Sequence, residues 1–354
     1  SASSKLIHGG LRYLEHYAFR LVREALAERE VLLRNAPHIM RPLRFILPHV
    51  PELRPAWMIR LGLFLYDRLG GPTSLPGSHG VRLDSGPYGA GLRAGLTRGF
   101  IYSDGWVDDA RLVALNARAA ADLGAEICVR TELTSARREN ARWRAPLVPA
   151  SGAPPREIRA RAIVNAAGPW ARQVLGRTLG LNSACRLRLI KGSHIVVPRL
   201  YDGEHAYILQ NDDRRVVFLI PYEGRFTLIG TTDIPLDGEP EPVTISEEET
   251  AYLCRAASRY LAKPVTQADV AWSYAGVRPL YDDGKTSASD ITRDYVLELD
   301  APDALAPALS IYGGKITTYR RLAEHALGQL AGFFPGLGPA WTAHVPLPGG
   351  DIPG

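Results

Sequence analysis

The sequence contains few cysteines, three among 354 residues. Cys128, Cys185 and Cys254 lie far apart, whereas cysteines that bind a metal ion usually stand in closely spaced groups. Each lies within or after apolar sequence, which favours buried, unreactive thiols over structural disulfides. We therefore expect no metal site, and the low cysteine content fits a reducing cytosolic compartment.

Long hydrophobic runs are also missing, although 46% of the residues are hydrophobic and the chain can bury a large core. The longest apolar stretch, residues 56–69 (AWMIRLGLFLYDRL), contains Arg60 and Asp67 and is too short to span a bilayer. Its aromatic and basic residues suit either a membrane interface or a core helix of a cap domain. The core helix is the preferred interpretation.

The charge distribution lacks a stripe of Lys and Arg interleaved with aromatic residues, which argues against a nucleic-acid partner. The net charge of +5 is modest and fits a phosphorylated substrate, an anionic membrane surface or plain solubility. The sequence has no internal repeat and no low-complexity tract. Composition therefore indicates an ordinary globular protein with one large or two interleaved domains.

Apolar periodicity predicts several helices. Residues 11–33 carry apolar side chains at helical spacing until Pro37, which favours one long amphipathic helix. Asp108 and Asp109 would lie in the first turn of a second helix, where the helix dipole favours negative charge. Further helices are expected over residues 56–69, 170–175 and 246–262, and from about Thr317 onward.

β-type segments alternate with these helices. Between residues 187 and 234, short alternating runs separated by polar turns predict an antiparallel sheet. Other strands are expected over residues 126–130, 159–165, 270–279, 295–299 and 309–312. The succession of helix, glycine and strand is typical of a layered α/β domain. The predicted fold class is therefore α/β, with one α/β domain built from discontinuous pieces and a sheet-based cap.

Five segments have compositions typical of ligand-binding loops. In the first, residues 1–14 (SASSKLIHGGLRYL), hydroxyl and glycine residues would let the backbone approach a flat or anionic ligand. The alternative is a plain capped helix start. In the second, residues 165–170 (NAAGPW), a strand ends in small residues either beside a cofactor or in an ordinary turn. Taken alone, the ordinary turn is preferred.

The other three segments contain ionisable candidates. His194 in KGSHIVVP alternates with apolar neighbours on a strand, where a histidine is more often a core or surface residue than a catalyst. Arg278 in YAGVRP, with Arg293 nearby, could bind a carboxylate or phosphate, or could pair with an acid such as Asp282. Residues 312–320 (YGGKITTYR) place a lysine where a strand meets a helix start, whose N–H groups attract electron-rich ligands. The glycine spacing there differs from that of a P-loop.

In this order, the segments resemble the aerobic FAD-dependent glycerol-3-phosphate dehydrogenases, a branch of the D-amino-acid-oxidase-like flavoprotein superfamily. The resemblance covers nearly the whole chain and rests on nine motifs in register: SSKLIHGGLRYL, YSDGWVDDARL, NAAGPW, LIKGSHIVVPR, YILQND, IGTTD, GVRPL, ITRDY and GGKITTYRRLAEHA. Family members also have a strand and a GxGxxG turn before the position of Ser1, and a helical region beyond Gly350. We therefore expect this chain to lack the N-terminal FAD-binding segment and the C-terminal region.

The resemblance implies a truncated, Rossmann-like FAD-binding domain and an antiparallel-sheet substrate cap. The FAD-binding domain would comprise residues 1–35, 100–172 and 290–345, without its N-terminal βαβ unit. The cap would comprise residues 36–99 and 173–289, and residues 346–354 would begin the C-terminal region.

It also implies the reaction: oxidation of sn-glycerol 3-phosphate to dihydroxyacetone phosphate, with hydride transfer to FAD because no side chain accepts a hydride. Arg12, Tyr13 and Lys315 would bind the phosphate. Arg278 would hold the oxygens at the reacting carbon, and His194, with a pKa near its ordinary value, would accept or relay the proton. The residues expected to line the cofactor are Ser3, Ser4, Lys5, His8, Gly9, Gly10, Gly168, Gly313, Gly314, Lys315, Ile316 and Thr317.

The electron acceptor is less determined. The resemblance implies membrane quinone and a peripheral position on the inner, cytoplasmic face of the cell membrane, and it leaves a homodimer open. One alternative is a glycerol-3-phosphate oxidase that uses oxygen, and another is a relative that acts on a different hydroxy acid or a secondary amine. A third is a non-catalytic fragment without flavin that binds phosphometabolites or a membrane surface.

Overall fold

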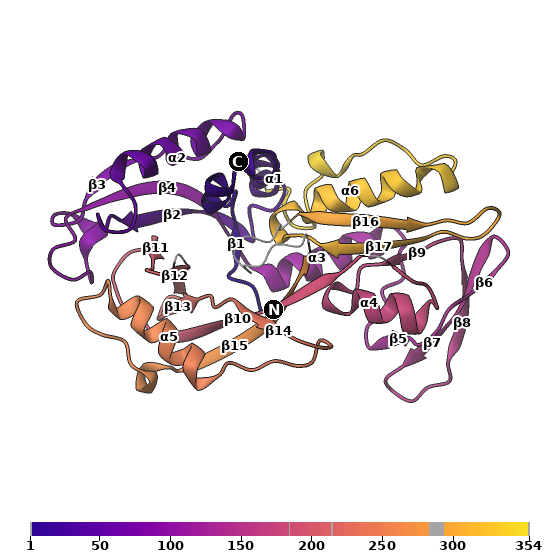
Figure 1. Ribbon diagram of the computed structural model, residues 1–354. Coiled ribbons are helices and arrows are strands. Elements are labelled where there is room, and N and C mark those ends of the chain that lie inside the picture. Colours follow the sequence, from indigo (N-terminus) through magenta and orange to yellow (C-terminus); the bar gives the residue numbers. More distant parts are fainter. Residues whose placement is uncertain (1, 184, 214, 283–293, 353–354) are drawn as a thin grey trace.

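The computed structural model describes residues 2–183, 185–213, 215–282 and 294–352. Figure 1 shows an elongated molecule with a large curled sheet at one end and two smaller sheets at the other. Helices α1 (Phe19–Asn35) and α2 (Ala56–Leu69) lie above the large sheet, and α5 (Glu247–Ser258) lies beneath it. The described N-terminus lies near the centre of the molecule, next to the sheet (Figure 1).

The large sheet has ten strands, and all but one of its pairings are antiparallel. Its main path runs through β1 (Leu6–Ile7), β4 (Arg98–Val107), β2 (Met40–Pro48), β11 (Ala206–Gln210), β12 (Val216–Tyr222), β13 (Phe226–Gly230), β10 (Leu187–Pro198) and β14 (Ile234–Leu236). At its sides, β3 (His79–Arg82) pairs with β4, and β15 (Trp272–Tyr281) pairs with β10. The predicted antiparallel sheet between residues 187 and 234 is therefore confirmed.

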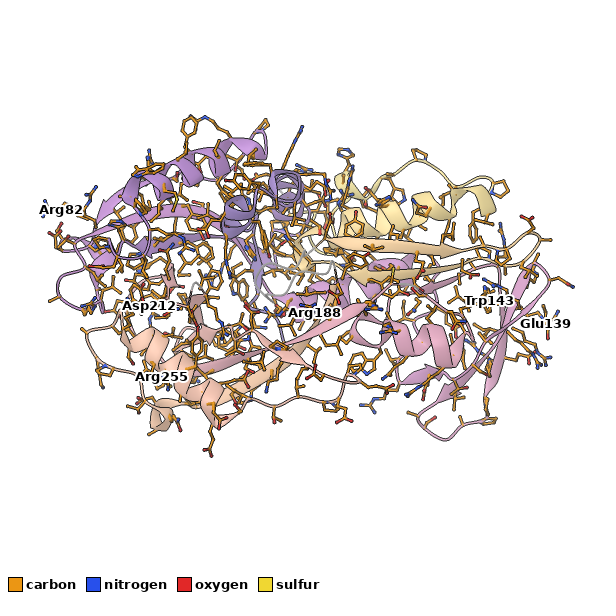
Figure 2. All side chains as sticks on the ribbon, in the orientation of Figure 1. Arg82, Glu139, Trp143, Arg188, Asp212 and Arg255 are labelled. Atoms are coloured by element: carbon orange, nitrogen blue, oxygen red, sulfur yellow. The ribbon has the colours of Figure 1, made fainter. Side chains whose placement is uncertain are left out.

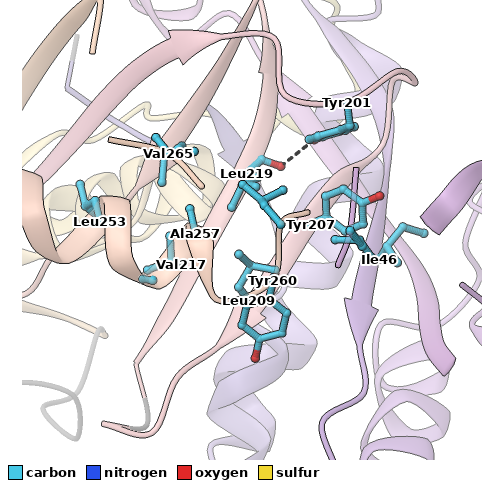
Figure 3. Packing of buried hydrophobic residues seen from close by; sticks show 14 of the residues in the cluster. Ile46, Tyr201, Tyr207, Leu209, Val217, Leu219, Leu253, Ala257, Tyr260 and Val265 are labelled. Atoms are coloured by element: carbon cyan, nitrogen blue, oxygen red, sulfur yellow. Dashed lines mark hydrogen bonds between the residues drawn. The ribbon is translucent and has the colours of Figure 1, made fainter. Parts of the chain in front are cut away.

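Alternation along the strands gives this sheet two apolar faces. On β10, Ile195 and Val197 join the core that includes Leu253 and Ala257 of α5, whereas Val196 joins the core beneath α1 and α2. Figure 3 shows the α5 side of this packing, where the hydroxyl of Tyr201 donates a hydrogen bond to the carbonyl oxygen of Leu219. Residues next to each other on β10 thus face different layers of the molecule.

The two smaller sheets lie at the other end (Figure 1). One has the order β16 (Tyr295–Asp300), β17 (Ala308–Gly313) and β9 (Ile163–Asn165), with β17 and β9 parallel. Helix α6 (Tyr319–Leu330) packs on it. The other comprises β5 (Thr131–Leu133), β6 (Arg137–Glu139), β7 (Arg142–Pro149) and β8 (Arg156–Ala160). It buries Trp143, and Glu139 lies at the opposite end of the molecule from Arg82 (Figure 2).

The α/β fold class with an antiparallel-sheet cap is confirmed, whereas the proposed division into domains stays a prediction. Strand β4 begins at Arg98 and crosses the predicted boundary between residues 99 and 100. Strand β1, which was predicted to belong to the FAD-binding domain, pairs with β4 in the large sheet. The two predicted domains therefore share this sheet.

Several helix predictions are confirmed. Helix α2 spans Ala56–Leu69, and α3 spans Asp109–Asp122 with the Asp108 carboxylate accepting a hydrogen bond from the backbone N–H of Arg111. Helix α5 begins after Ser246 with a capping box, in which Ser246 and Glu249 each bond the other's backbone N–H. These starts follow the expected cap chemistry.

The prediction of one helix over residues 11–33 is wrong. A 3₁₀ helix (Leu11–His16) ends at Tyr17, whose φ of 56° is left-handed, and α1 begins at Phe19. The N–H groups of Tyr17 and Ala18 bond the carbonyl oxygens of Leu14 and Tyr13 and close the first turn. Apolar periodicity does not detect this break, because neither Gly nor Pro marks it.

Two strand predictions also need correction. Residues 126–130 form no strand; Ile127 and Val129 are exposed there, so no packing favours an extended conformation, and β5 begins at Thr131. Residues 159–165 are not one strand either, because β8 ends at Ala160 and β9 begins at Ile163 in a different sheet.

A buried ion pair joins α6 to α1 and provides a test of this architecture. The Arg320 guanidinium donates two hydrogen bonds to the Glu28 carboxylate, and both side chains are less than 10% exposed. We expect Arg320→Met to lower the free energy of unfolding by about 3 kcal/mol, because it leaves a buried carboxylate without compensation. Equilibrium urea unfolding measures this change.

The control is Arg118→Met, which removes an exposed guanidinium that pairs with Asp122 four residues later on α3. It should leave the unfolding midpoint nearly unchanged, because exposed pairs contribute little. Equal effects of the two substitutions would contradict the assignment of a structural role to the buried pair.

Candidate active site

One face of β10 and β15 carries the two predicted catalytic side chains on either side of a pair of glycines. In the register of these strands, His194 lies opposite Tyr274 and Gly192 lies opposite Gly276, with Arg278 two residues further along β15. Cross-strand partners share a face and alternate residues return to it, so all five project to the same side. A Cβ on Gly192 would lie 2.4 Å from Arg278 Nη2. Glycine at position 192 therefore leaves room for the Arg278 guanidinium to lie against the strand beside His194.

His194 is buried beneath the N-terminal segment. Its Nε2 lies 2.8 Å from the hydroxyl of Ser4, and its ring stacks on Tyr274 with 4.8 Å between centroids. The Tyr274 hydroxyl donates a hydrogen bond to the carbonyl oxygen of Ser3 at 2.8 Å. Nδ1 of His194 is buried without a hydrogen-bond partner among the described residues. Two side chains of the sheet thus hold the predicted cofactor-binding residues Ser3 and Ser4.

The expectation that His194 titrates near its ordinary pKa is wrong. Burial, together with the positive charges of Arg278 and Lys5, lowers the pKa of His194 to about 3. Its imidazole is therefore neutral at physiological pH. The local sequence could not reveal this shift, because distant segments supply the burial and the charges.

Arg278 is held by the segment that follows β13. Its Nη2 donates to the carbonyl oxygen of Thr232 at 2.7 Å and lies 2.7 Å from Oδ1 of Asp233. Asp282, the acid considered as a partner of Arg278, lies 2.9 Å from Arg188. Arg293 lies outside the described residues. The sequence analysis assigned no role to Asp233, although it is the last residue of the quoted IGTTD motif.

The first and last of the five predicted segments are in contact. The hydroxyl of Thr317 both accepts from the N–H of His8 and donates to its carbonyl oxygen, each at 3.3 Å. Nζ of Lys315 lies 4.0 Å from the centre of the Tyr13 ring. Tyr13 and Lys315, both predicted to bind phosphate, thus lie together although they are far apart in the sequence.

Buried polar side chains form a hydrogen-bonded chain that fixes the backbone of Gly9. The N–H of Gly9 donates to the hydroxyl of Tyr66 at 2.8 Å, and that hydroxyl donates to Asp104 at 2.7 Å. Arg29 completes the set with a bond of 2.8 Å to the same carboxylate. The sequence analysis missed these supports, which come from α2, β4 and α1.

Two other predicted site residues, Lys5 and Arg12, differ in their contacts. Nζ of Lys5 lies 2.8 Å from Asp109, which was predicted only as a dipole-complementing residue at the start of α3. Arg12 makes no hydrogen bond or ion pair with another described residue, and no contact joins it to Arg278 or Lys315. Of the three side chains predicted to bind the phosphate, Tyr13 and Lys315 are therefore in contact, whereas the place of Arg12 beside them stays a prediction.

Glycines mark the edge where β9 and β17 end. These neighbouring parallel strands are paired up to Asn165 and Ser310, and Gly168 and Gly313 each follow three residues later. Gly168, Gly313 and Gly314 have φ values of 58°, 80° and 102°, which other residues rarely adopt. The carboxyl ends of parallel strands are the usual place for a cofactor in α/β proteins.

These features fit a flat, electron-rich cofactor. Gly192 and Gly276 let Arg278 and Ala2 lie close to the backbone of β10 and β15, and a buried nitrogen of His194 lacks a partner among the described residues. Residues 315–317 provide N–H groups before the start of α6. Ile316, also predicted to line the cofactor, lies in this turn. The residues present therefore suit the flavin that the sequence predicts.

Comparison with known proteins agrees with a flavin-binding protein. A family model described as "FAD dependent oxidoreductase" matches residues 1–300. A glycerol-3-phosphate dehydrogenase of Pseudomonas aeruginosa is 60% identical over 99% of this chain and 68% of its own length. A D-erythritol 1-phosphate dehydrogenase of Brucella abortus is 53% identical over 99% of this chain and 70% of its own length.

A solved structure also aligns with the chain. The glycerol-3-phosphate dehydrogenase of Bacillus halodurans, complexed with FAD, aligns with a TM-score of 0.71 and 27% identity. The alignment covers 99% of this chain and 60% of that protein. The expected relationship to D-amino-acid-oxidase-like flavoproteins is thus confirmed: the chain belongs to the FAD dependent oxidoreductase family.

Proposed function

We propose that this protein oxidises sn-glycerol 3-phosphate to dihydroxyacetone phosphate with FAD as the hydride acceptor. The observation that carries the proposal is the placement of His194 and Arg278 on one face of the sheet, on either side of the glycine pair Gly192 and Gly276. This arrangement offers a neutral imidazole and a cation to the reacting end of a secondary alcohol. The names of the relatives in Pseudomonas aeruginosa and Bacillus halodurans support the same substrate.

Each residue has a proposed task. Bound FAD supplies the hydride acceptor, which no side chain can replace. Neutral His194 accepts a hydrogen bond from the substrate hydroxyl and takes or relays its proton. Arg278, oriented by Thr232 and Asp233, holds the oxygens at the reacting end and stabilises developing negative charge.

The phosphate end of the substrate would be bound at the other contact between distant segments. Lys315 lies over the ring of Tyr13, and Arg12 is the preceding residue. We propose that these three side chains bind the phosphate dianion. Two cations and a phenol hydroxyl complement a dianionic phosphate better than they complement an amino acid. The cofactor would contact residues 3–5, 8–10 and 313–317 together with Gly168.

The reduced flavin would pass its electrons to quinone in the cell membrane, with the protein on the cytoplasmic face of that membrane. No helix among the described residues is long and apolar enough to cross a membrane. Helix α2 nevertheless exposes Trp57, Leu61 and Phe64, while its Leu63 is fully buried. A cavity of about 820 Å³ with many apolar lining residues lies between this helix and the 3₁₀ helix Leu11–His16. Peripheral contact through α2 is therefore the favoured arrangement.

A second substrate has specific support, because the relative from Brucella abortus is named for D-erythritol 1-phosphate. The two compounds share a phosphate and a secondary hydroxyl, so the same residues serve both. Comparing kcat/KM for the two substrates distinguishes them. Hydrogen peroxide formation in air would instead favour the oxidase alternative, and a protein that retains no FAD would favour the non-catalytic one.

The first prediction concerns Arg278. Arg278→Ala in the FAD-loaded enzyme should lower kcat/KM for glycerol 3-phosphate by roughly 100-fold or more, since it removes a charge-assisted contact in the transition state. Bound flavin, measured by its visible absorbance, should not change. Arg82→Ala, which removes an exposed guanidinium paired with Asp84, is the control. Near-normal turnover of Arg278→Ala would remove this residue from the site.

The second prediction concerns pH. A base must be unprotonated to act, and a histidine at its ordinary pKa of 6.5 would lose activity below that value. Because burial lowers the pKa of His194 to about 3, kcat at saturating substrate should stay level from about pH 8 to about pH 5. An acidic limb near pH 6.5 that vanishes in His194→Gln would show this prediction to be wrong.

The third prediction concerns α2. Leu61→Asp should reduce co-flotation with vesicles containing phosphatidylglycerol by roughly 10-fold, because it places a carboxylate on the exposed apolar face. Leu123→Asp, at an exposed leucine after α3, should have no effect. Substitution of Leu63 would disturb the core instead. Equal flotation of both variants and the unmodified protein would exclude α2 as the contact.

A further inference from the structure

We propose that Glu249 is a positioning residue for Arg278, although it lies on the opposite face of the large sheet. The inference rests on the proposed function, because it takes Arg278 to contact the substrate. Glu249 belongs to the first turn of α5, and its side chain is 5% exposed. Buried carboxylates are rare unless hydrogen-bonded partners compensate them, so the partners of Glu249 indicate what it does.

Four donors surround this carboxylate. Oε1 accepts from the hydroxyls of Ser193 at 2.8 Å and Thr232 at 2.7 Å. Oε2 accepts from the N–H of Ser246 at 3.0 Å and lies 2.7 Å from Nζ of Lys191. Burial acts to raise the pKa of Glu249, but these donors outweigh it and the pKa is lowered. Glu249 is therefore an ionised acceptor at neutral pH.

Thr232 carries the connection through the sheet. Its hydroxyl donates to Glu249 and accepts from the N–H of Ser193 at 2.9 Å. These two hydrogen bonds fix the orientation of the Thr232 side chain. The carbonyl oxygen of the same residue accepts from Nη2 of Arg278 at 2.7 Å. One residue thus separates Glu249 from the guanidinium on the other face.

Asp233 strengthens the connection. It follows Thr232 directly, and its Oδ1 lies 2.7 Å from the same Nη2 of Arg278. The hydrogen-bond acceptor and the ion-pair partner of the guanidinium therefore stand on adjacent residues, and Glu249 holds the first of them through its hydroxyl. A shift of Thr232 would move both groups together and would misalign Arg278, because charge-assisted interactions depend on direction.

The helix cap alone does not require all these contacts. A capping box needs only the reciprocal bonds between Ser246 and Glu249. Glu247, in the same turn, is exposed and adds negative charge near the helix start without a hydrogen bond to the sheet. The bonds to Ser193 and Thr232 instead tie α5 to the middle of β10 and to the segment between β13 and β14.

A double-mutant cycle in the FAD-loaded enzyme tests the inference. Glu249→Gln should lower kcat/KM for glycerol 3-phosphate by about 10-fold while FAD content stays unchanged. In the Arg278→Ala background the same substitution should cost less than about 2-fold, because the residue that it positions is gone. Glu247→Gln, the matched control, should have no effect in either background.

The outcomes separate this inference from the proposed function. If Glu249→Gln costs the same factor in both backgrounds, Glu249 is only structural and the inference is overturned. If Arg278→Ala itself leaves kcat/KM unchanged, the proposed function fails instead.

A second pair of variants covers the case in which Glu249→Gln does not fold. Thr232→Val keeps the shape but removes the hydroxyl, and it should reproduce the loss of about 10-fold, whereas Thr232→Ser should restore activity. Full activity of Thr232→Val would also overturn the inference.

Discussion

The packing of residues 3–10, which include strand β1 of the large sheet, is the constraint on which the candidate active site depends. This segment passes the His194 face of the sheet and then reaches the turn that contains Lys315. A buried backbone must satisfy its polar groups, and here side chains from distant segments do so: Tyr274 bonds the carbonyl oxygen of Ser3, and Tyr66 bonds the N–H of Gly9. The ends of the site are therefore joined by one short stretch of chain, and each of those contacts fixes its path.

Cations and carboxylates around the site are organised in pairs. Arg278 pairs with Asp233, and Lys5 pairs with Asp109. Such pairs contribute little net stability once desolvation is included, but they fix the direction in which a charge points. An enzyme that stabilises developing charge benefits from groups that need no reorientation during the reaction. Direction, more than the number of cations, is thus the property that this arrangement supplies.

The sequence predicted the local structure well where local chemistry decides it. The bounds of α2 follow from apolar periodicity, and α5, which begins at Glu247, lies within the helix predicted over residues 246–262. The break at Tyr17 was missed because hydrogen bonds, without Gly or Pro, produce it. Of the site, the contact of the first and last motifs was predicted through family resemblance. Asp233 was not, and the pKa of His194 was wrong, because both depend on segments that only the fold brings near.

Strand β10 shows why the site cannot be separated from the rest of the molecule. Its successive residues face opposite layers, so His194 lines the candidate site while Ser193 contacts α5. Its pairing with β15 also sets Gly192 against Gly276, and a Cβ on Gly276 would meet Ala2 at 2.6 Å. The side chains of Arg278 and Ala2 lie over these two glycines, so a larger residue at either position would clash with them. The shape of the site therefore follows from strand register, which both apolar cores of the sheet stabilise.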